Sequence, residues 1–512
     1  MLRGLRSLWR ILRIARTLQR HDALASLQGQ DLGPGLRWMT RVFSGRHVEG
    51  RPGQKLARAL TDLGPSFIKL GQVLSTRADL LGEEVAADLS DLQDRLPPFP
   101  SAEARRTIES ELGSPLAELF SSFEDEPVSA ASIAQVHFAV TLEGEPVAVK
   151  VLRPGIEGAF ERDLEFFAWL AGLIERTQPK LRRFRPREVV DLFERQVRLE
   201  MDLRMEAAAA SELGENFSGD PAYNTPPIDW QRTSRRVLTM NRISGIPIDD
   251  RGALLAAGHD LEAILATAAE IFFKQVFRDG LFHGDQHPGN MFVGEAGDIV
   301  AVDFGIMGRI DRKTRFYLAD MLTATLARDY RRLALIHVEA GYLPPRVEVD
   351  TFAQALRSVC EPITGKPLEE ISFARLLAQL LQVTESFDMP VQPSLLLLQK
   401  NMLIAEGISR LLVPGLNIWS LAQPLIEAWM VENRSPAARL RDSTDDWLQR
   451  LQRLPDTLDA LEQAARHLSN GGAAMSPHAL TAINGHRRAW TWHIRALWIA
   501  LALLALGLVA AL

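Results

Sequence analysis

Residues 283–290 read His-Gly-Asp-Gln-His-Pro-Gly-Asn, and an Asp-Phe-Gly triplet follows at 303–305. Asp285 and Asn290 are five residues apart, and Asp303 follows thirteen residues after Asn290. A hard cation such as Mg²⁺ prefers oxygen ligands, so Asn290 and Asp303 are candidate ligands of metal ions that bridge nucleotide phosphates. Asp285 is the candidate proton acceptor or donor in catalysis. Either fragment alone would indicate only a turn, but the ordered combination predicts a nucleotide site.

This order of motifs is typical of protein-kinase-like folds, which also carry a lysine on an upstream strand. Two β-rich runs, at 136–142 and 147–152, are joined by Glu143-Gly144-Glu145-Pro146, which predicts a hairpin. Lys150 falls in the second run, where an unpaired ammonium would be costly. An edge-strand lysine that reaches water is the alternative. The later motifs favour a phosphate or carboxylate partner instead.

A stretch of small residues precedes the hairpin, where a kinase would carry its Gly-rich phosphate loop. The stretch and its flank comprise Ser129, Ala130, Ala131, Ser132, Ile133, Ala134, Gln135, Val136 and His137. Small residues let the backbone approach phosphates, but alanine lacks the positive-φ freedom of glycine. We therefore expect a stiffer loop and a different nucleotide pose.

Three acids follow in the segment LEMDLRMEAAAA, which predicts one Ala-rich helix. Asp202 and Glu206 are four residues apart and would share a helical face, whereas Glu200 lies about 1.7 turns from Glu206. Any of the three could pair with Lys150 or Lys69. Acids on helices more often face solvent, so the pattern alone leaves the partner open.

Composition sets the broad class. A chain of 512 residues suggests about three units. With 46% hydrophobic and 24% charged residues it is globular in composition. A net charge of −6, with no basic run interleaved with aromatics, predicts no nucleic-acid partner. The single cysteine, Cys360, rules out an internal disulfide and a Cys-rich zinc site.

The two ends differ from the middle. Residues 1–25 predict a basic amphipathic helix suited to an anionic lipid surface, the alternative being a helix docked on the protein itself. The run from 496 to 512 is apolar throughout, at the short end of the roughly 17–25 residues that span a bilayer. We predict a transmembrane segment over 489–512, preceded by a helical juxtamembrane segment over 426–488. Basic residues before this run place the body of the chain in the cytoplasm. A buried terminal helix is the alternative.

The predicted fold class is α+β, a protein-kinase-like two-lobe fold with an N-terminal helical extension over 26–125 and a C-terminal transmembrane helix. The N-lobe is predicted over 126–245 and the C-lobe over 246–425. After Asp303-Phe304-Gly305 the chain passes directly into a helical pattern near residue 314, with no activation-loop length and no Ala-Pro-Glu anchor. This absence favours ATP hydrolysis or a small substrate over a protein substrate.

Taken together, the motifs resemble those of the UbiB family of atypical kinases of ubiquinone biosynthesis, over about residues 26 to 425. The motifs that carry the resemblance are FIKLGQ at 67–72, the Ala-rich loop at 129–137, VAVK at 147–150, EMDLRME at 200–206, HGDQHPGN at 283–290 and DFG at 303–305.

The resemblance implies a role for each matching residue. Lys150 would contact the nucleotide phosphates and pair with an acid, foremost Glu206, while Asp285 would be the catalytic base and Asn290 and Asp303 would bind Mg²⁺. Lys69 and Gln72 would fold over the place where an ordinary kinase admits a peptide. Glu200 and Asp202 would face the same cleft. Arg204 stands where we expect an aromatic in many relatives, which puts local packing of that helix in question.

The implied cofactors are ATP or ADP and Mg²⁺. The implied partners are anionic membrane lipid, polyprenyl-phenol quinone precursors and other ubiquinone-biosynthesis enzymes, at the bacterial cytoplasmic membrane with the catalytic body facing the cytoplasm. A homodimer is left open. Two other hypotheses stand beside an ATPase, namely a phosphotransferase acting on a lipid or protein and a nucleotide-dependent scaffold. A hydroxylase is rejected, because the sequence carries no flavin fingerprint, Glu-x-x-His di-iron pair or haem-type Cys motif.

Overall fold

The structure is a computed structural model. It describes residues 10, 13–23, 48–75, 83–90, 92, 96–177, 186–364 and 392–416, together with single positions and short runs between 379 and 433. The chain divides into two compact units, Met1–Met430 and Val431–Leu512, and nearly all described residues belong to the first.

The predicted transmembrane segment over 489–512 lies outside the described residues, and so does nearly all of the segment over 426–488. Of the predicted basic helix over 1–25, the described residues 13–20 are helical. Among the helices that the structure describes, none has the length and apolar character needed to cross a membrane.

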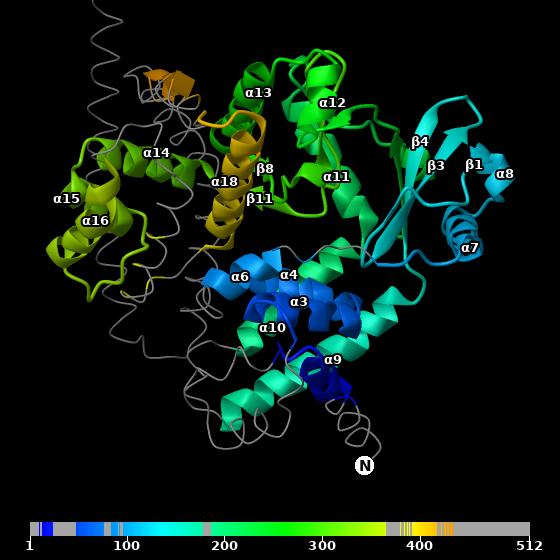
Figure 1. The fold of residues 1–512 in the computed structure, drawn as a ribbon, viewed down its shortest axis with the longest axis horizontal. Coiled ribbons are helices and arrows are strands. Elements are labelled where there is room, and N and C mark those ends of the chain that lie inside the picture. Colours follow the sequence, from blue (N-terminus) through cyan, green and yellow to red (C-terminus); the bar gives the residue numbers. More distant parts are fainter. Residues whose placement is uncertain are drawn as a thin grey trace, which may run out of the picture. The chain divides into compact units, whose positions relative to one another are not determined.

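An antiparallel five-stranded sheet forms the core of the first lobe (Figure 1). Its strands are β1 (Phe120–Phe123), β2 (Ser129–Ala130), β3 (Ala134–Thr141), β4 (Pro146–Leu152) and β6 (Val237–Asn241), in the order β1-β3-β4-β6 with β2 paired to β3. β3 and β4 confirm the predicted hairpin. Val147, Val149 and Val151 of β4 share one hydrophobic cluster with Ile108 of α7 (Ser101–Leu112). Because side chains alternate along a strand, Lys150 lies on the opposite face of the sheet.

A second hydrophobic cluster joins the N-terminal helices to helices that follow the hairpin. The first group is α3 (Pro52–Leu63), α4 (Pro65–Ser75) and α6 (Glu83–Ser90), and the second is α9 (Ile156–Thr177) and α10 (Pro186–Glu200). Phe67 of α4 packs edge-on against Phe167 of α9, and Phe167 packs in turn against Phe193 of α10. Figure 1 shows the blue helix α4 beside α10 and α9, and α3 packs on α4. This packing fixes α4, which carries Lys69 and Gln72.

The predicted single helix through 200–206 is wrong. α10 ends at Glu200, and α11 (Leu203–Asn216) begins after Asp202, whose side chain accepts a hydrogen bond from the backbone N–H of Arg204. Aspartate favours such an N-cap because its carboxylate satisfies a free helical N–H group. Asp202 and Glu206 therefore do not share a continuous helical face, and the Asp202 carboxylate is also paired with Arg204.

The second lobe holds two small sheets, ordered β5-β10-β9-β7 and β11-β8. The strands are β5 (Tyr223–Asn224), β7 (Ile246–Pro247), β8 (Leu281–His283), β9 (Met291–Val293), β10 (Ile299–Ala301) and β11 (Met307–Arg309). The segment with Asp285 and Asn290 connects β8 to β9, and Asp303 follows β10 as predicted. β9 and β10 are antiparallel, with Met291 opposite Ala301. Asn290 immediately precedes β9, and Asp303 follows β10. Both residues therefore lie at the same end of this strand pair.

Helices complete the second lobe. They are α12 (Arg251–Ala256), α13 (Leu261–Phe273), a π-helical turn at Lys274–Asp279, α14 (Arg312–Leu326), α15 (Tyr330–Glu339), α16 (Val349–Thr364) and α18 (Pro393–Leu412). α14 begins three residues after β11, so the prediction that no activation loop follows the Asp-Phe-Gly triplet is confirmed. Leu398 of α18 shares a hydrophobic cluster with Val276 and Phe282, which anchors this helix beside β8.

Candidate functional site

A buried lysine lies between two carboxylates where the two lobes contribute side chains. Lys150 Nζ donates to Glu206 Oε1 at 2.7 Å and Oε2 at 3.0 Å, and lies 3.2 Å from Asp303 Oδ1. The side chains of Lys150 and Glu206 are only 10% and 7% exposed. Burial disfavours the ammonium, but the charges of Asp303 and Glu206 outweigh it and raise the pKa of Lys150. The structure thus pairs Lys150 with Glu206, the acid that the family resemblance implied foremost.

Asp303 keeps an accessible carboxylate beside this pair. Its side chain is 47% exposed, and its backbone φ is +60°, a left-handed conformation uncommon outside glycine. The charges of Lys150 and Lys69 lower the pKa of Asp303 below its ordinary range. Asp303 is therefore an ionised oxygen donor at neutral pH, as a ligand of a hard cation must be.

Asn290 lies next to Asp303 through backbone pairing. The N–H of Val302 donates to the Asn290 carbonyl at 2.9 Å, and Asn290 Nδ2 donates to the Asp285 carbonyl at 3.1 Å. The amide oxygen Oδ1 of Asn290 is the atom of this side chain that could coordinate a cation. In the described part of the chain, no group of three His, Cys, Asp or Glu side chains could hold a metal ion by itself. The donor set of Asn290 and Asp303 fits Mg²⁺, which in nucleotide sites takes one or two protein oxygens and completes its shell with phosphates and water.

The N-terminal extension reaches the same place. Lys69 Nζ of α4 lies 3.0 Å from Glu200 Oε2 at the end of α10, and both side chains are mostly buried. Lys69 is also close enough to Asp303 to lower the pKa of that carboxyl. Gln72, one helical turn later, has a buried side-chain oxygen with no hydrogen-bond partner in the described part of the chain. The structure therefore places Lys69 and Glu200 with Lys150, Glu206 and Asp303, whereas the Asp202 carboxylate is engaged by Arg204.

Asp285 is held by its own loop and by a distant helix. The backbone N–H of Asp285 donates to His283 Nδ1 at 3.1 Å, and His283 Nε2 lies 3.2 Å from the Val302 carbonyl. Burial lowers the pKa of His283, so its ring is neutral with Nε2 as donor, a tautomer assigned from these bonds. The Asp285 carboxylate accepts from Lys400 Nζ of α18 at 2.7 Å.

The small-residue loop is divided by the sheet. Ser129 and Ala130 form β2, residues 134–137 belong to β3, and only residues 131–133 connect them. Arg153 fixes the turn, because its Nε donates to the Ala131 carbonyl at 3.1 Å and its backbone N–H to the Ile133 carbonyl at 2.8 Å. Ser132 is fully buried, and its hydroxyl has no hydrogen-bond partner among the residues that the structure describes.

The last two polar residues of the predicted loop are engaged elsewhere. Gln135 accepts from the N–H of Phe99 at 3.0 Å and contacts His137 Nε2 at 2.8 Å, while His137 Nδ1 bonds the Glu124 carbonyl at 2.8 Å. Both side chains are almost completely buried, and burial lowers the pKa of His137. The structure does not bring Gln135 and His137 to the Lys150 cluster, because they fasten β3 to neighbouring segments.

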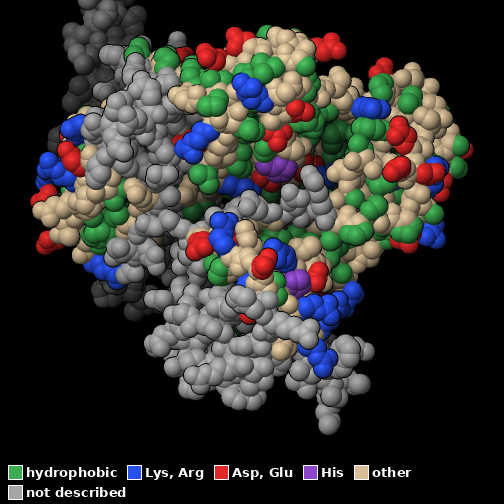
Figure 2. Space-filling model, viewed as in Figure 1, with side chains coloured by type: hydrophobic (Ala, Val, Ile, Leu, Met, Phe, Trp, Pro, Cys, Tyr) green, Lys and Arg blue, Asp and Glu red, His purple; other side chains and the backbone are tan. Residues whose placement is uncertain are grey.

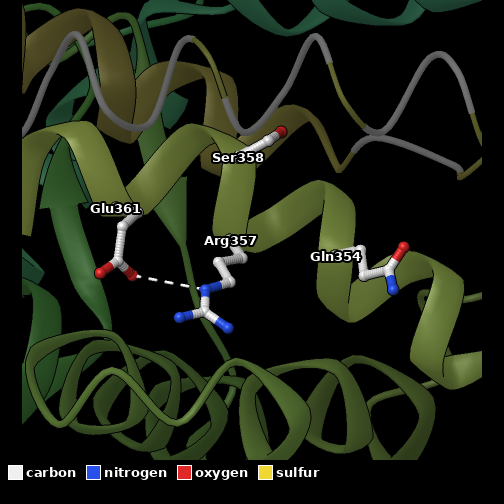
Figure 3. A pocket seen from close by; sticks show the side chains of 4 residues that line it. All are labelled: Gln354, Arg357, Ser358 and Glu361. Carbon is white, nitrogen blue, oxygen red and sulfur yellow. Dashed lines mark ion pairs between the residues drawn. The ribbon is translucent and has the colours of Figure 1, made fainter.

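A shallow pocket lies on α16, lined by Gln354, Arg357, Ser358 and Glu361 (Figure 3). Its charged groups, Arg357 and Glu361, pair with each other at 3.7 Å across one helical turn, and Arg357 is largely solvent-exposed whereas Glu361 is half-buried. Pairs of this spacing are common on helix surfaces. We place the candidate site at the Lys150 cluster, where buried charges converge from both lobes.

Sequence reasoning missed four residues that shape this site, namely Arg153, Gln275, Lys400 and Asn401. Gln275 Oε1, in the π-helical turn, accepts from the His283 N–H at 3.1 Å and from Gln286 Nε2 at 3.2 Å. Lys400 and Asn401 belong to the polar run Gln399-Lys400-Asn401 within the Leu-rich helix α18. Polar residues inside an apolar helix need polar partners, and this was the signal that could have found them.

The fold and this cluster define a protein-kinase-like class, and the similarity to known proteins agrees. Residues 91–337 match the ABC1 atypical kinase-like domain, and residues 356–417 match the UbiB helical domain. The chain is 45% identical over 419 residues to "Probable protein kinase UbiB" of Marinobacter nauticus. The aligned region covers 80% of this chain and 77% of that protein. The protein with the same name from Pseudomonas paraeruginosa is 43% identical, covering 85% and 83% respectively.

A solved structure of Rv3197 with erythromycin from Mycobacterium tuberculosis is 27% identical, with a TM-score of 0.48, and covers 72% of this chain and 93% of that one. The identity to the curated relatives over most of both chains decides the assignment. The chain belongs to the UbiB family of atypical kinase-like proteins, whose name connects it with ubiquinone biosynthesis.

Proposed function

We propose that this chain binds a Mg-nucleotide at the Lys150 cluster and acts as a membrane-associated ATPase that supports ubiquinone synthesis. The observation that carries the proposal is the position of Lys150, buried between Glu206 and Asp303 at 2.7 and 3.2 Å. The buried ammonium of Lys150 is paired with Glu206 and also faces the accessible carboxylate of Asp303. It can therefore contact a phosphate while its ion pair with Glu206 stays intact.

Each residue then has a chemical task. Lys150 would contact nucleotide phosphates, and Asn290 and Asp303 would hold Mg²⁺, which neutralises charge on those phosphates when bound. Asp285 would take the proton of the attacking water or hydroxyl. Phosphoryl transfer depends mainly on positioning and charge stabilisation, so these groups suffice in principle for nucleotide hydrolysis.

The surroundings of the site support a small acceptor rather than a protein. Lys69 and Glu200 pair at 3.0 Å beside the cluster, and β11 leads into α14 with no activation loop between them. A kinase that phosphorylates proteins lays its substrate on that loop. We therefore propose water or a small molecule as the acceptor, with Lys69 and Gln72 closing the side where a peptide would bind.

The membrane part of the proposal rests on the sequence of the two ends and on the family. We propose that the basic residues 1–25 and the apolar residues 489–512 attach the chain to the bacterial cytoplasmic membrane, with the catalytic body in the cytoplasm. On the face shown in Figure 2, acidic and basic side chains are interspersed over the described residues. Polyprenyl-phenol precursors and other enzymes of ubiquinone synthesis are the proposed partners at that membrane.

Phosphate release by the purified full chain tests the proposal. We expect Mg²⁺-dependent release of phosphate from ATP, and an increase when anionic liposomes and a phenolic lipid are added. Radiolabel that moves from ATP to lipid or protein instead of water would show a phosphotransferase. If Asp285→Asn abolishes turnover yet still restores quinone synthesis in a strain that lacks the gene, the protein acts as a nucleotide-dependent scaffold and the ATPase proposal is wrong.

A further inference from the structure

Two successive residues of α18 contact the loop that carries Asp285. Lys400 Nζ donates to Asp285 Oδ1 at 2.7 Å, and the two side chains are 26% and 22% exposed. Asn401 Oδ1 accepts from the N–H of Gln286 at 3.2 Å, and its Nδ2 donates to the His283 carbonyl. One helix, 115 residues away in sequence, thus binds both the side chain of the proposed base and the backbone on either side of it.

The helix is well suited to hold this loop. Leu398 of α18 packs with Phe282 and Val276 in one hydrophobic cluster, so the helix is fixed to β8 immediately before the loop. Asn401 is fully buried in a mainly apolar helix. A buried amide is costly unless both its donor and its acceptor are satisfied, and here both of the bonds that the structure shows for it go to the loop. The contact therefore couples the position of α18 to the position of Asp285.

The loop also lacks a cation of its own. Residues 283–290 contain no lysine and no arginine, although phosphoryl transfer develops negative charge that fixed cations stabilise. Lys400 brings a positive charge to the proposed base from outside the segment that matches the kinase-like domain. That segment covers residues 91–337, whereas Lys400 and Asn401 lie within 356–417, the match to the helical domain.

We propose that Lys400 is a positioning residue for catalysis and that the helical domain completes the active site. Lys400 holds Oδ1 of Asp285, so the proton of the attacking water or hydroxyl passes to Oδ2. The oxygen of that acceptor forms a bond to the terminal phosphorus, and the bond from phosphorus to the bridging oxygen breaks. The nucleoside diphosphate leaves with the electron pair. The role in turnover rests on the proposed function, whereas the coupling between Lys400 and Asp285 can be measured without it.

Steady-state kinetics test the role in turnover. We expect Lys400→Met to lower kcat of phosphate release by about 100-fold, as loss of orientation at a reacting group does. The Kd for ATP should stay within about threefold of the wild-type value, because Lys150 and Asp303 remain. Lys400→Arg should recover most of the lost kcat. Lys313→Met is the matched control, because Lys313 is exposed on α14 over the Tyr317 ring and should leave kcat unchanged.

Either of two kinetic results would overturn the proposal. One is a Lys400→Met variant whose kcat lies within about threefold of the wild-type value. The other is an increase in the Kd for ATP that is as large, as a fold-change, as the decrease in kcat. If Lys400 had only a structural role, Lys400→Met would lower the fraction of active protein and would not lower kcat selectively at an unchanged Kd. Lys400→Arg would then not restore activity.

A double-mutant cycle on the melting temperature decides the coupling even if the protein releases no phosphate. We expect Lys400→Met to lower the melting temperature of wild type but to leave that of Asp285→Asn nearly unchanged, because the charged pair is already lost there. Additive shifts would overturn the coupling between the two residues. If the protein releases no phosphate but the two substitutions have non-additive effects on the melting temperature, the proposed ATPase activity is refuted. The positioning of Asp285 by Lys400 is then still supported.

Discussion

Replacing Lys150 with methionine is the perturbation whose effect follows most directly from the structure. The substitution keeps an unbranched side chain of similar length, but it removes the charge that Glu206 contacts at 2.7 and 3.0 Å. Glu206 is then left almost completely buried, with its side chain only 7% exposed and its main partner gone. The variant should therefore be less stable, and its stability should depend on pH more steeply.

The size of the loss follows from the burial of the pair. Removing one partner of a buried ion pair costs about 3–5 kcal/mol in the free energy of unfolding. Glu206 can limit this cost by taking up a proton, and Asp303 is exposed enough to be solvated, which favours the lower end, about 3 kcal/mol at neutral pH. An exposed pair on one helix contributes only about 0.3–0.5 kcal/mol.

The pH dependence has a definite sign. Burial raises the pKa of Glu206 from its ordinary value of 4.5, and Lys150 acts against this rise. Without Lys150 the folded-state pKa of Glu206 rises further. A carboxyl group whose pKa is higher in the folded than in the unfolded state destabilises the protein increasingly as pH rises between those two values. The stability gap between wild type and Lys150→Met should therefore be smaller at pH 5 than at pH 8, by about 1.4 kcal/mol for each unit of additional rise.

Denaturant unfolding at the two pH values, followed by tryptophan fluorescence, measures both quantities. Arg198→Met is the matched control, because Arg198 pairs with Glu194 at 2.7 Å across one turn of α10 with a side chain 58% exposed. Arg198→Met should lower the free energy of unfolding by less than about 0.5 kcal/mol at either pH. A loss below about 1 kcal/mol for Lys150→Met, or a gap that narrows as pH rises, would refute the reasoning about the buried pair.

Three further results are expected. Asp285→Asn should lower kcat by about 100-fold or more and spare the Kd for ATP, and an unchanged kcat would exclude Asp285 as the base. Gly308→Ala should cost about 1–3 kcal/mol in thermal unfolding, because a Cβ there would lie 2.1 Å from the fully buried ring of Phe282, and a neutral effect would contradict this packing. Burial raises the pKa of the Cys360 thiol to about 11, so iodoacetamide at pH 8 should label the native protein far more slowly than the unfolded chain; equal rates would contradict the buried position.

Local patterns predicted the part of the fold that surrounds the candidate site. The hairpin of β3 and β4 followed from two β-rich runs with a turn between them, and the strand before Asp303 followed from its apolar character. The apolar strand also predicted that Lys150 has a carboxylate or phosphate partner, and the structure pairs it with Glu206, the acid that only the family resemblance had singled out.

Features that depend on local caps or distant contacts were not predicted. The break between α10 and α11 was missed, although Asp202 is a favourable N-cap residue, because the alanine-rich composition on its C-terminal side favoured one long helix. The contact of Lys400 with Asp285 joins residues 115 positions apart. No periodicity within either segment encodes that contact, which results from packing of α18 on β8.

Metal-dependent nucleotide binding tests the central claim most directly. Binding of ATP to the full chain should be measured by calorimetry with and without Mg²⁺, for wild type, Asp303→Asn and the control Asp350→Asn, whose target carboxylate is 77% exposed in a surface pair with Arg331. We predict that wild type and the control bind ATP with Mg²⁺ and that Asp303→Asn loses at least about tenfold in affinity, because a metal-ligand charge is gone. Equal affinity of Asp303→Asn and wild type would contradict the assignment of this cluster as a Mg-nucleotide site.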